Sequence, residues 1–245
     1  NSISIWQVSS MTDTQFQRTL LLFGSAGIAR LRQSRVAVVG CGAVGSFAIE
    51  ALARTGVGHL FLADGDTVQP SNINRQLCAL HSTIGQNKAQ TLAARIHDIC
   101  PDTRVIAYPD FIRPETLPDL LAFRPDFVID AIDILPDKAG LICAVQQAGI
   151  PLVSSMGAAL KTDPLSVRLA PLNQTSVCPL AARLRRLLKR QGADLTFPCV
   201  YSVEKPAAAR DSGRQMGSLI TLTGLFGLVL ANTVILQLVK EPLNA

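Results

Sequence analysis

The sequence has few aromatic residues, few charges for its length, and no closely spaced pair of cysteines. Aromatic residues make up 5% of the 245 positions and charged residues 17%, and so low a fraction of charged residues does not favour long disordered segments. The six cysteines are Cys41, Cys78, Cys100, Cys143, Cys178 and Cys199. None belongs to a CxxC motif, so we expect neither a compact zinc site nor a dense disulfide framework. Because the chain is long and lacks the cysteine density of a disulfide scaffold, we expect a reducing cytoplasm. The first residues lack a basic stretch followed by an apolar run, so we expect no signal peptide.

The remaining composition is that of a folded chain with a positive charge. Apolar residues make up 48%, which is ample for a buried core, and the length allows one large domain or two small ones. The formal net charge of +5 permits an anionic partner without requiring one.

One long segment, 215–239, carries no formal charge and is long enough to span a bilayer. Six polar residues interrupt it: Ser218, Thr221, Thr223, Asn232, Thr233 and Gln237. Gly224 and Gly227 suit close packing against another helix. The segment also lacks the clusters of positive charge that often flank a membrane span. We therefore favour a core helix and expect no membrane span.

Strand-like and helix-like patterns alternate through the first 165 residues. We expect strands at 35–39, 59–63, 104–108, 126–130 and 151–155, and helices at 44–54, 88–99, 115–123 and 137–148. This alternation predicts an α/β fold with a doubly wound, mainly parallel sheet.

The pattern changes after about Pro164. We expect strands at 166–170 and 199–203, a basic amphipathic helix at 179–191, and a polar, mobile segment at 204–217. We interpret residues 1–245 as a single domain. It comprises an N-terminal helical arm (1–34), a nucleotide-binding core (35–165) and a C-terminal elaboration (166–245) that ends in the core helix.

Gly40, Gly42 and Gly45 form a GxGxxG motif between an expected strand and an expected helix. Backbone N–H groups and the helix dipole favour anions such as phosphates at such a turn. Asp64 ends the next expected strand, at the spacing of an acid that binds ribose hydroxyls. The pattern favours a site for an adenine nucleotide rather than a turn with a purely structural role. It does not distinguish NAD from ATP.

A polar cluster follows Asp64 and bears on that choice: Asn72, Asn74, Arg75, Gln76 and Lys88. A dehydrogenase has no general need for these residues. An adenylating enzyme uses Arg and Lys to stabilise charge that develops on a triphosphate. Taken alone, Lys88 fits a solvated surface position equally well.

Asp130 and Asp133 end the fourth expected strand, in the stretch VIDAIDILPDK. Ligands of doubly wound sheets bind at this carboxyl edge, and a carboxylate there can hold the Mg²⁺ that bridges phosphates. Two acids in a loop are common, so this signal counts only together with the others.

The order FQRT, GCGAVGS, ADGDTV, SNINRQ, GQNKA and VIDAID resembles the ThiF/MoeB/HesA superfamily, which shares the fold of ubiquitin-activating enzymes. The resemblance implies adenylation of a carboxylate by ATP with Mg²⁺, without zinc, and leaves open a monovalent cation (Na⁺ or K⁺). It also implies a homodimer in which Arg18 on the N-terminal arm reaches the partner's active site.

The same resemblance implies a set of site residues. The nucleotide would contact Gly40, Gly42, Ala43, Gly45, Asp64, Ser71, Asn72, Asn74, Arg75 and Lys88. Asp64 would hold the ribose, Arg75 and Lys88 would neutralise the triphosphate, and Asp133 would organise Mg²⁺. Together with Arg18, the last three are the expected catalytic residues.

The chain departs from the family pattern at a few positions. Ala43 and Met156 stand where a glycine is common, and segment 211–217 lacks a cysteine that relatives often carry. Cys178 and Cys199 are candidates for a thioester cysteine, but we favour a buried structural role for both.

Within the superfamily, EALARTGVG and the run CPLAARLRRLLKRQGADLTFPCVYSVEKP are similar to the tRNA threonylcarbamoyladenosine dehydratases. The implied reaction adenylates the threonyl carboxylate of the modified tRNA base and closes a ring with release of AMP. A cysteine-desulfurase or sulfur-acceptor partner is left open. Three alternatives stand beside this interpretation: an NAD(P)-linked oxidoreductase, an adenylyltransferase of a ubiquitin-like sulfur carrier, and a non-catalytic tRNA-binding or sulfur-relay scaffold.

The expected basic helix fits a tRNA partner. Five cations crowd eight positions: Arg183, Arg185, Arg186, Lys189 and Arg190. Phosphate contacts supply most non-specific affinity for nucleic acid, so we favour tRNA binding by these residues. A solvated helix that packs by its leucines is the alternative.

Overall fold

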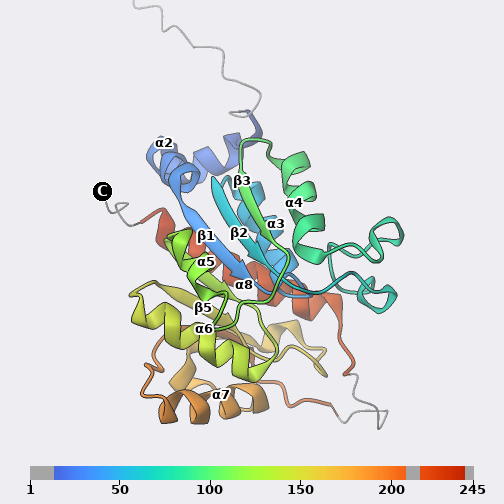
Figure 1. Cartoon of the computed structure of the whole chain (residues 1–245), viewed down its shortest axis with the longest axis vertical. Coiled ribbons are helices and arrows are strands. Elements are labelled where there is room, and N and C mark those ends of the chain that lie inside the picture. The colour runs from blue at the N-terminus through green and yellow to red at the C-terminus, as the bar shows by residue number, and fades with distance from the viewer. Residues whose placement is uncertain (1–13, 208–215, 241–245) are drawn as a thin grey trace, which may run out of the picture.

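The computed structural model describes residues 14–207 and 216–240 of the chain (Figure 1). Most of the segment at 204–217, which we expected to be mobile, therefore lies outside the described residues, as does the start of the N-terminal arm.

A seven-stranded sheet forms the centre of the molecule, in the order β3-β2-β1-β4-β5-β7-β6. The strands are β1 (Arg35–Val39), β2 (His59–Ala63), β3 (Arg104–Tyr108), β4 (Phe127–Asp130), β5 (Leu152–Ser155), β6 (Val167–Pro171) and β7 (Pro198–Ser202). All neighbours pair in parallel except β6, which runs antiparallel to β7. The mainly parallel α/β fold is therefore confirmed.

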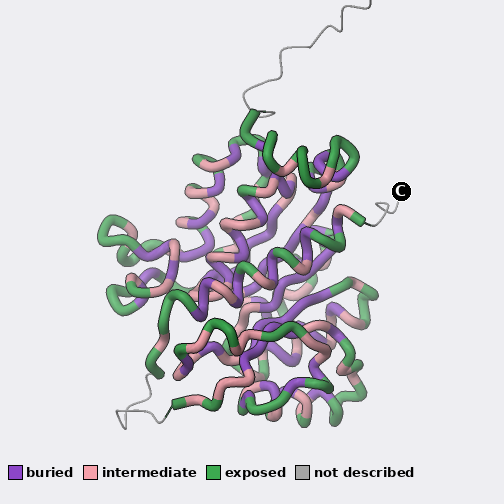
Figure 2. Tube along the Cα trace, turned by 180° about the vertical axis from the view of Figure 1, so that it is seen from behind, coloured by how far each residue is buried: buried purple, intermediate pink, exposed green. Residues whose placement is uncertain are grey.

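Helices cover both faces of this sheet. They are α2 (Gln17–Gln33), α3 (Gly45–Thr55), α4 (Lys88–Ile99), α5 (Leu117–Ala122), α6 (Leu135–Gln147), α7 (Pro179–Arg190) and α8 (Ile220–Leu238). One apolar layer lies under α2, α3, α4 and α8, and a second under α5, α6 and α7. The central strands are apolar on both sides because both faces are covered, and Figure 2 shows this buried interior.

The observed elements begin and end close to the expected positions. The helix expected over 88–99 is α4, and its start at Lys88 follows from the side chain of Asn87, which accepts a hydrogen bond from the backbone N–H of Gln90. Helix α2 is interrupted at Gly24, whose φ of 69° is not helical. The arm is thus two helical pieces joined at a glycine.

Helix α8 forms most of the long uncharged segment. It is the one helix in the described part of the chain that is long and apolar enough to cross a membrane, with a mean hydropathy of 1.7. Ten of its residues are buried, and Gly227 packs so closely that an added Cβ would lie 2.3 Å from the carbonyl oxygen of Val44. The helix is part of the core, as the sequence predicted.

Candidate functional site

The residues predicted to bind the nucleotide and the metal ion lie on segments that follow β1, β2 and β4, at the carboxyl edge of the sheet, whereas the predicted catalytic residue Arg18 lies on α2 and is not among them. Strand order reverses between β1 and β4, because the chain leaves β1 into α3 on one face of the sheet and leaves β4 into α6 on the other. Ligands of doubly wound sheets bind at such a switch point. The glycine turn follows β1, Asp64 follows β2, and Asp133 follows β4. The fold therefore brings together residues that are up to 93 positions apart (133 − 40).

Two of the three glycines in the turn are required by packing. Gly40 has a φ of +94°, and an added Cβ would lie 2.6 Å from the carbonyl oxygen of Ala131. A Cβ on Gly45 would lie 1.7 Å from the carbonyl oxygen of Gly40, so no side chain fits there. At Gly42, by contrast, the nearest atom would be Nε2 of Gln76 at 3.6 Å, an ordinary contact. The turn is thus tight within the protein and open at Gly42.

Asp64 is buried and ties the end of β2 to the glycine turn. Its Oδ2 accepts a hydrogen bond from the backbone N–H of Cys41 at 2.7 Å, and its Oδ1 accepts one from that of Asp66 at 2.9 Å. Burial raises the pKa of this carboxyl, although nearby Lys88 and the two N–H groups act in the opposite direction. Each oxygen keeps a free acceptor site, so the carboxylate can still accept hydrogen bonds from a ribose.

Lys88 is not the solvated residue that one interpretation of the sequence allowed. It lies at the start of α4 with only 6% of its surface exposed, and its Nζ is 2.7 Å from Oδ2 of Asp66. Asp66 is itself largely exposed, so the partner of Lys88 lies at the solvent-facing edge of the site. A cation that is buried and paired in this way can exchange its partner for an anionic ligand.

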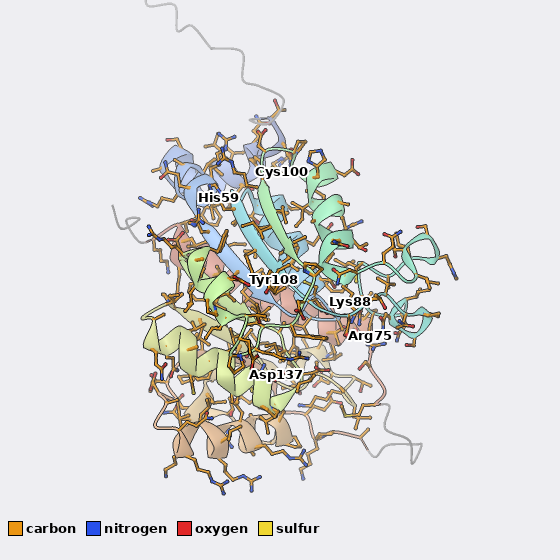
Figure 3. The ribbon with its side chains drawn as sticks, in the orientation of Figure 1. His59, Arg75, Lys88, Cys100, Tyr108 and Asp137 are labelled. Atoms are coloured by element: carbon orange, nitrogen blue, oxygen red, sulfur yellow. The ribbon has the colours of Figure 1, made fainter. Side chains whose placement is uncertain are left out.

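The segment between β2 and α4 is held by its own polar side chains. Arg75 donates from Nη1 to the carbonyl oxygen of Ser71 at 2.7 Å and to Oδ1 of Asn74 at 2.8 Å. Oδ1 of the buried Asn72 accepts a hydrogen bond from the N–H of Gln69. These bonds shape the loop on the side of the molecule where Figure 3 shows Arg75 and Lys88. The nucleotide contacts expected of these residues remain predictions.

The two aspartates after β4 have different environments. Asp130 is fully buried, lies 2.8 Å from Nζ of Lys138, and accepts a hydrogen bond from Oγ of Ser154 at 2.6 Å. Asp133 is exposed and has no hydrogen bond or ion pair within residues 14–207 and 216–240. Asp133 is therefore the acid that is free to bind a ligand.

Within the described ranges, no three His, Cys, Asp or Glu residues are grouped so that they could hold a metal ion. A single exposed carboxylate such as Asp133 fits Mg²⁺, because this ion is commonly held by one or two carboxylates together with substrate phosphates. Asp133 would be the protein's ligand.

Helix α7 presents most of its predicted cations to solvent. Arg183, Arg186, Lys189 and Arg190 are exposed, whereas Leu184 and Leu188 are buried in the core. Arg185 differs from the prediction, because its half-buried Nη1 donates to the carbonyl oxygen of Thr175 at 2.9 Å and to the hydroxyl of the same residue. Its guanidinium holds the turn before α7 instead of facing solvent.

The cysteines are consistent with structural roles. All six are free thiols, and Cys178 and Cys199 are buried. Burial raises the pKa of the Cys199 thiol far above its usual range and that of Cys78 to about 11, so neither is an activated nucleophile.

These features define an α/β protein of the nucleotide-binding class. They are a glycine turn that can bind an anion, a buried acid and a paired lysine, all at the carboxyl edge of the sheet. The chain belongs to the ThiF family, whose model matches residues 16–245.

Proteins similar to this chain agree with that assignment. It is 43% identical to the tRNA threonylcarbamoyladenosine dehydratase of Bacillus subtilis, over 82% of this chain and 79% of the relative. The structure of the E. coli tRNA N6-threonylcarbamoyladenosine dehydratase TcdA in complex with AMP is 35% identical, covers 97% of both chains and superposes with a TM-score of 0.89. The same protein in complex with ATP gives a TM-score of 0.88.

Proposed function

We propose that this chain is an ATP-dependent tRNA threonylcarbamoyladenosine dehydratase. The observation that carries the proposal is the likeness, over nearly the whole chain, to a dehydratase solved with AMP and with ATP. The open side of the glycine turn at Gly42, with Asp64 and Lys88 beside it, supports nucleotide binding at the corresponding edge of this sheet.

The nucleotide would lie across the carboxyl edge of β1 and β2. Phosphates would meet the N–H groups at the start of α3, while Asp64 would accept hydrogen bonds from the ribose. Lys88 and Arg75 would exchange their present oxygen partners for phosphate oxygens. Mg²⁺, held by Asp133, would neutralise charge on the departing pyrophosphate.

The chemistry then needs two displacements. In the first, the threonyl carboxylate attacks the α-phosphorus of ATP, an acyl adenylate forms, and pyrophosphate leaves. In the second, a nucleophilic atom of the modified base attacks the acyl carbon, a ring closes and AMP leaves. The carboxylate oxygen departs with AMP, so the modified base loses the elements of water. Cations preorganised around the phosphates favour the first step because charge develops there.

A direct test is to incubate the chain with ATP, Mg²⁺ and threonylcarbamoyl-modified tRNA, and to weigh the digested nucleosides. We expect the modified nucleoside to lose the mass of one water, with one AMP formed per cyclised base. The control replaces ATP with a non-hydrolysable α,β-methylene analogue, which should give no mass change. AMP release with a ubiquitin-like carrier, and none with tRNA, would favour the adenylyltransferase alternative instead.

We also propose that the chain works as a homodimer. Several large apolar side chains are exposed on α2 and α8, including Leu21 at 76%, Leu22 at 79% and Leu228 at 47%. Burying such side chains against a second copy would be favourable. Arg18 lies exposed on the same arm, which supports its predicted reach into the partner's site.

A monovalent cation, a sulfur-acceptor partner and a cytoplasmic location stay predictions.

The exposed cations of α7 are proposed to bind tRNA phosphates. Replacing Arg183 and Arg186 with Gln should weaken tRNA binding by roughly three- to tenfold at low salt and reduce the slope of log affinity against log salt by about 1.5 to 2. Filter binding at several salt concentrations measures both quantities.

A matched double variant is Arg54→Gln with Arg104→Gln, which removes the same charge at the other end of the sheet. It should leave the slope nearly unchanged. If both double variants lower the slope equally, the effect is one of net charge and α7 is not the binding surface.

A further inference from the structure

Lys138 is among the largest side chains in the described residues that are shut off from solvent. An ammonium group is rarely buried without a partner, because losing its hydration is costly. Its Nζ lies 2.8 Å from Oδ2 of Asp130, and both side chains are fully buried. The pair lies directly beneath the turn that carries Asp133.

The two charged groups hold opposite sides of one residue in that turn. Nζ of Lys138 donates to the carbonyl oxygen of Ile132 at 2.9 Å. Oδ1 of Asp130 accepts a hydrogen bond from the N–H of Ile132 at 3.1 Å. Ser154 on β5 donates its hydroxyl to Asp130 at 2.6 Å, so the carboxylate is itself fixed. Both polar groups of the Ile132 backbone are thus bound by this ion pair.

The loop after β4 packs directly against the glycine turn after β1. The N–H of Ala131 donates to the carbonyl oxygen of Val39 at 2.8 Å, and the carbonyl oxygen of Ala131 fills the space where Gly40 would carry a Cβ. Asp133 follows Ile132 directly. A displacement of Ile132 would therefore move Asp133 relative to the phosphates that the glycine turn is proposed to bind.

We propose that Lys138 is a positioning residue: with Asp130, it fixes the Ile132 peptide and thereby sets where Asp133 meets Mg²⁺. This inference rests on the proposed ATP and magnesium site. Apolar residues of similar volume can match or exceed the stability of a buried ion pair. They cannot donate to the Ile132 carbonyl or accept from its N–H, so the pair supplies a geometry that an apolar core would not.

The test measures ATP binding by calorimetry with Mg²⁺ and with EDTA, and takes the ratio of the two affinities. The main variant is Asp130→Asn with Lys138→Met, which leaves no unpaired buried charge. We expect its affinity in EDTA to stay within about twofold of the wild type, while the enhancement by Mg²⁺ falls about tenfold or more. Ile142→Ala is the matched control, because it opens a cavity in the same helix while the two hydrogen bonds from Asp130 and Lys138 to the Ile132 backbone are kept. It should lower the unfolding temperature and keep the full enhancement.

Ser154→Ala is a milder second variant, which loosens Asp130 without stranding a charge. It should reduce the enhancement in the same direction by about twofold or more. Full enhancement by Mg²⁺ in both variants would overturn the positioning role and leave the pair a purely structural one. A wild-type chain whose ATP affinity does not respond to Mg²⁺ would instead refute the magnesium assignment of Asp133, and this inference with it.

Discussion

Replacing Asp133 with Ala is expected to lower ATP-dependent AMP formation by about 100-fold or more, because the charge that develops on the phosphates loses its organised metal ion. The side chain is exposed and has no partner within the described ranges, so its removal costs the fold little. We expect the free energy of unfolding to change by less than about 0.5 kcal/mol. Single-turnover AMP formation and a denaturant titration measure the two quantities.

The control for this variant is Asp137→Ala, four residues further along and in the first turn of α6. It changes the net charge by the same amount close to the same place. A small helix-dipole effect on stability is expected, with AMP formation within about threefold of the wild type. Normal turnover by Asp133→Ala would show that this carboxylate does not organise the metal. Equal losses in both variants would show that local charge alone matters.

Replacing Gly45 with Ala should destabilise the fold far more than replacing Gly42 with Ala. The new Cβ would lie 1.7 Å from the carbonyl oxygen of Gly40, a distance that no small side-chain movement can relieve. The turn must open, which we expect to cost about 3 kcal/mol or more of folding free energy. The helix start would move with it, so ATP binding should be lost as well.

Gly42→Ala separates packing from ligand binding at the same turn. Its Cβ would meet Nε2 of Gln76 at 3.6 Å, so folding stability should change by less than about 0.5 kcal/mol. A methyl group on the open side of the turn would nevertheless occupy space proposed for a phosphate. We expect ATP affinity to fall about tenfold, or about 1.4 kcal/mol. Unchanged ATP affinity in this variant would place the phosphates elsewhere.

Most of the fold could be predicted because its signals are local. The strand over 59–63 reads as HLFLA and the helix over 88–99 has apolar residues at helical spacing, and both form as expected. A parallel sheet that is covered on both faces requires such strands to be apolar throughout, so composition alone marks them. The core position of α8 was predicted from its polar interruptions, the lack of clustered positive charge at its ends, and Gly224 and Gly227, whose missing side chains allow close approach to α3.

The environment of each charged residue was much harder to predict. Lys88 and Lys138 are both lysines near the start of a helix, yet one is paired with a largely exposed acid and the other with a fully buried one. Asp130 and Asp133 share one short loop, but only Asp130 meets Ser154, which lies 24 positions away. Arg185 shares a basic helix with four exposed cations, but its guanidinium is half-buried and donates a hydrogen bond to the carbonyl oxygen of Thr175.

The sequence by itself determined the order of strands and helices, the tight glycine turn, and the presence of an acid and cations at one edge of the sheet. These features follow from spacing and from steric rules that act over a few residues. Only the tertiary structure decided which acid is free, which lysine is buried, and which arginine serves the fold. The reason is that desolvation and hydrogen bonding depend on atoms brought together from distant parts of the chain, and the sequence around a single charge does not specify them.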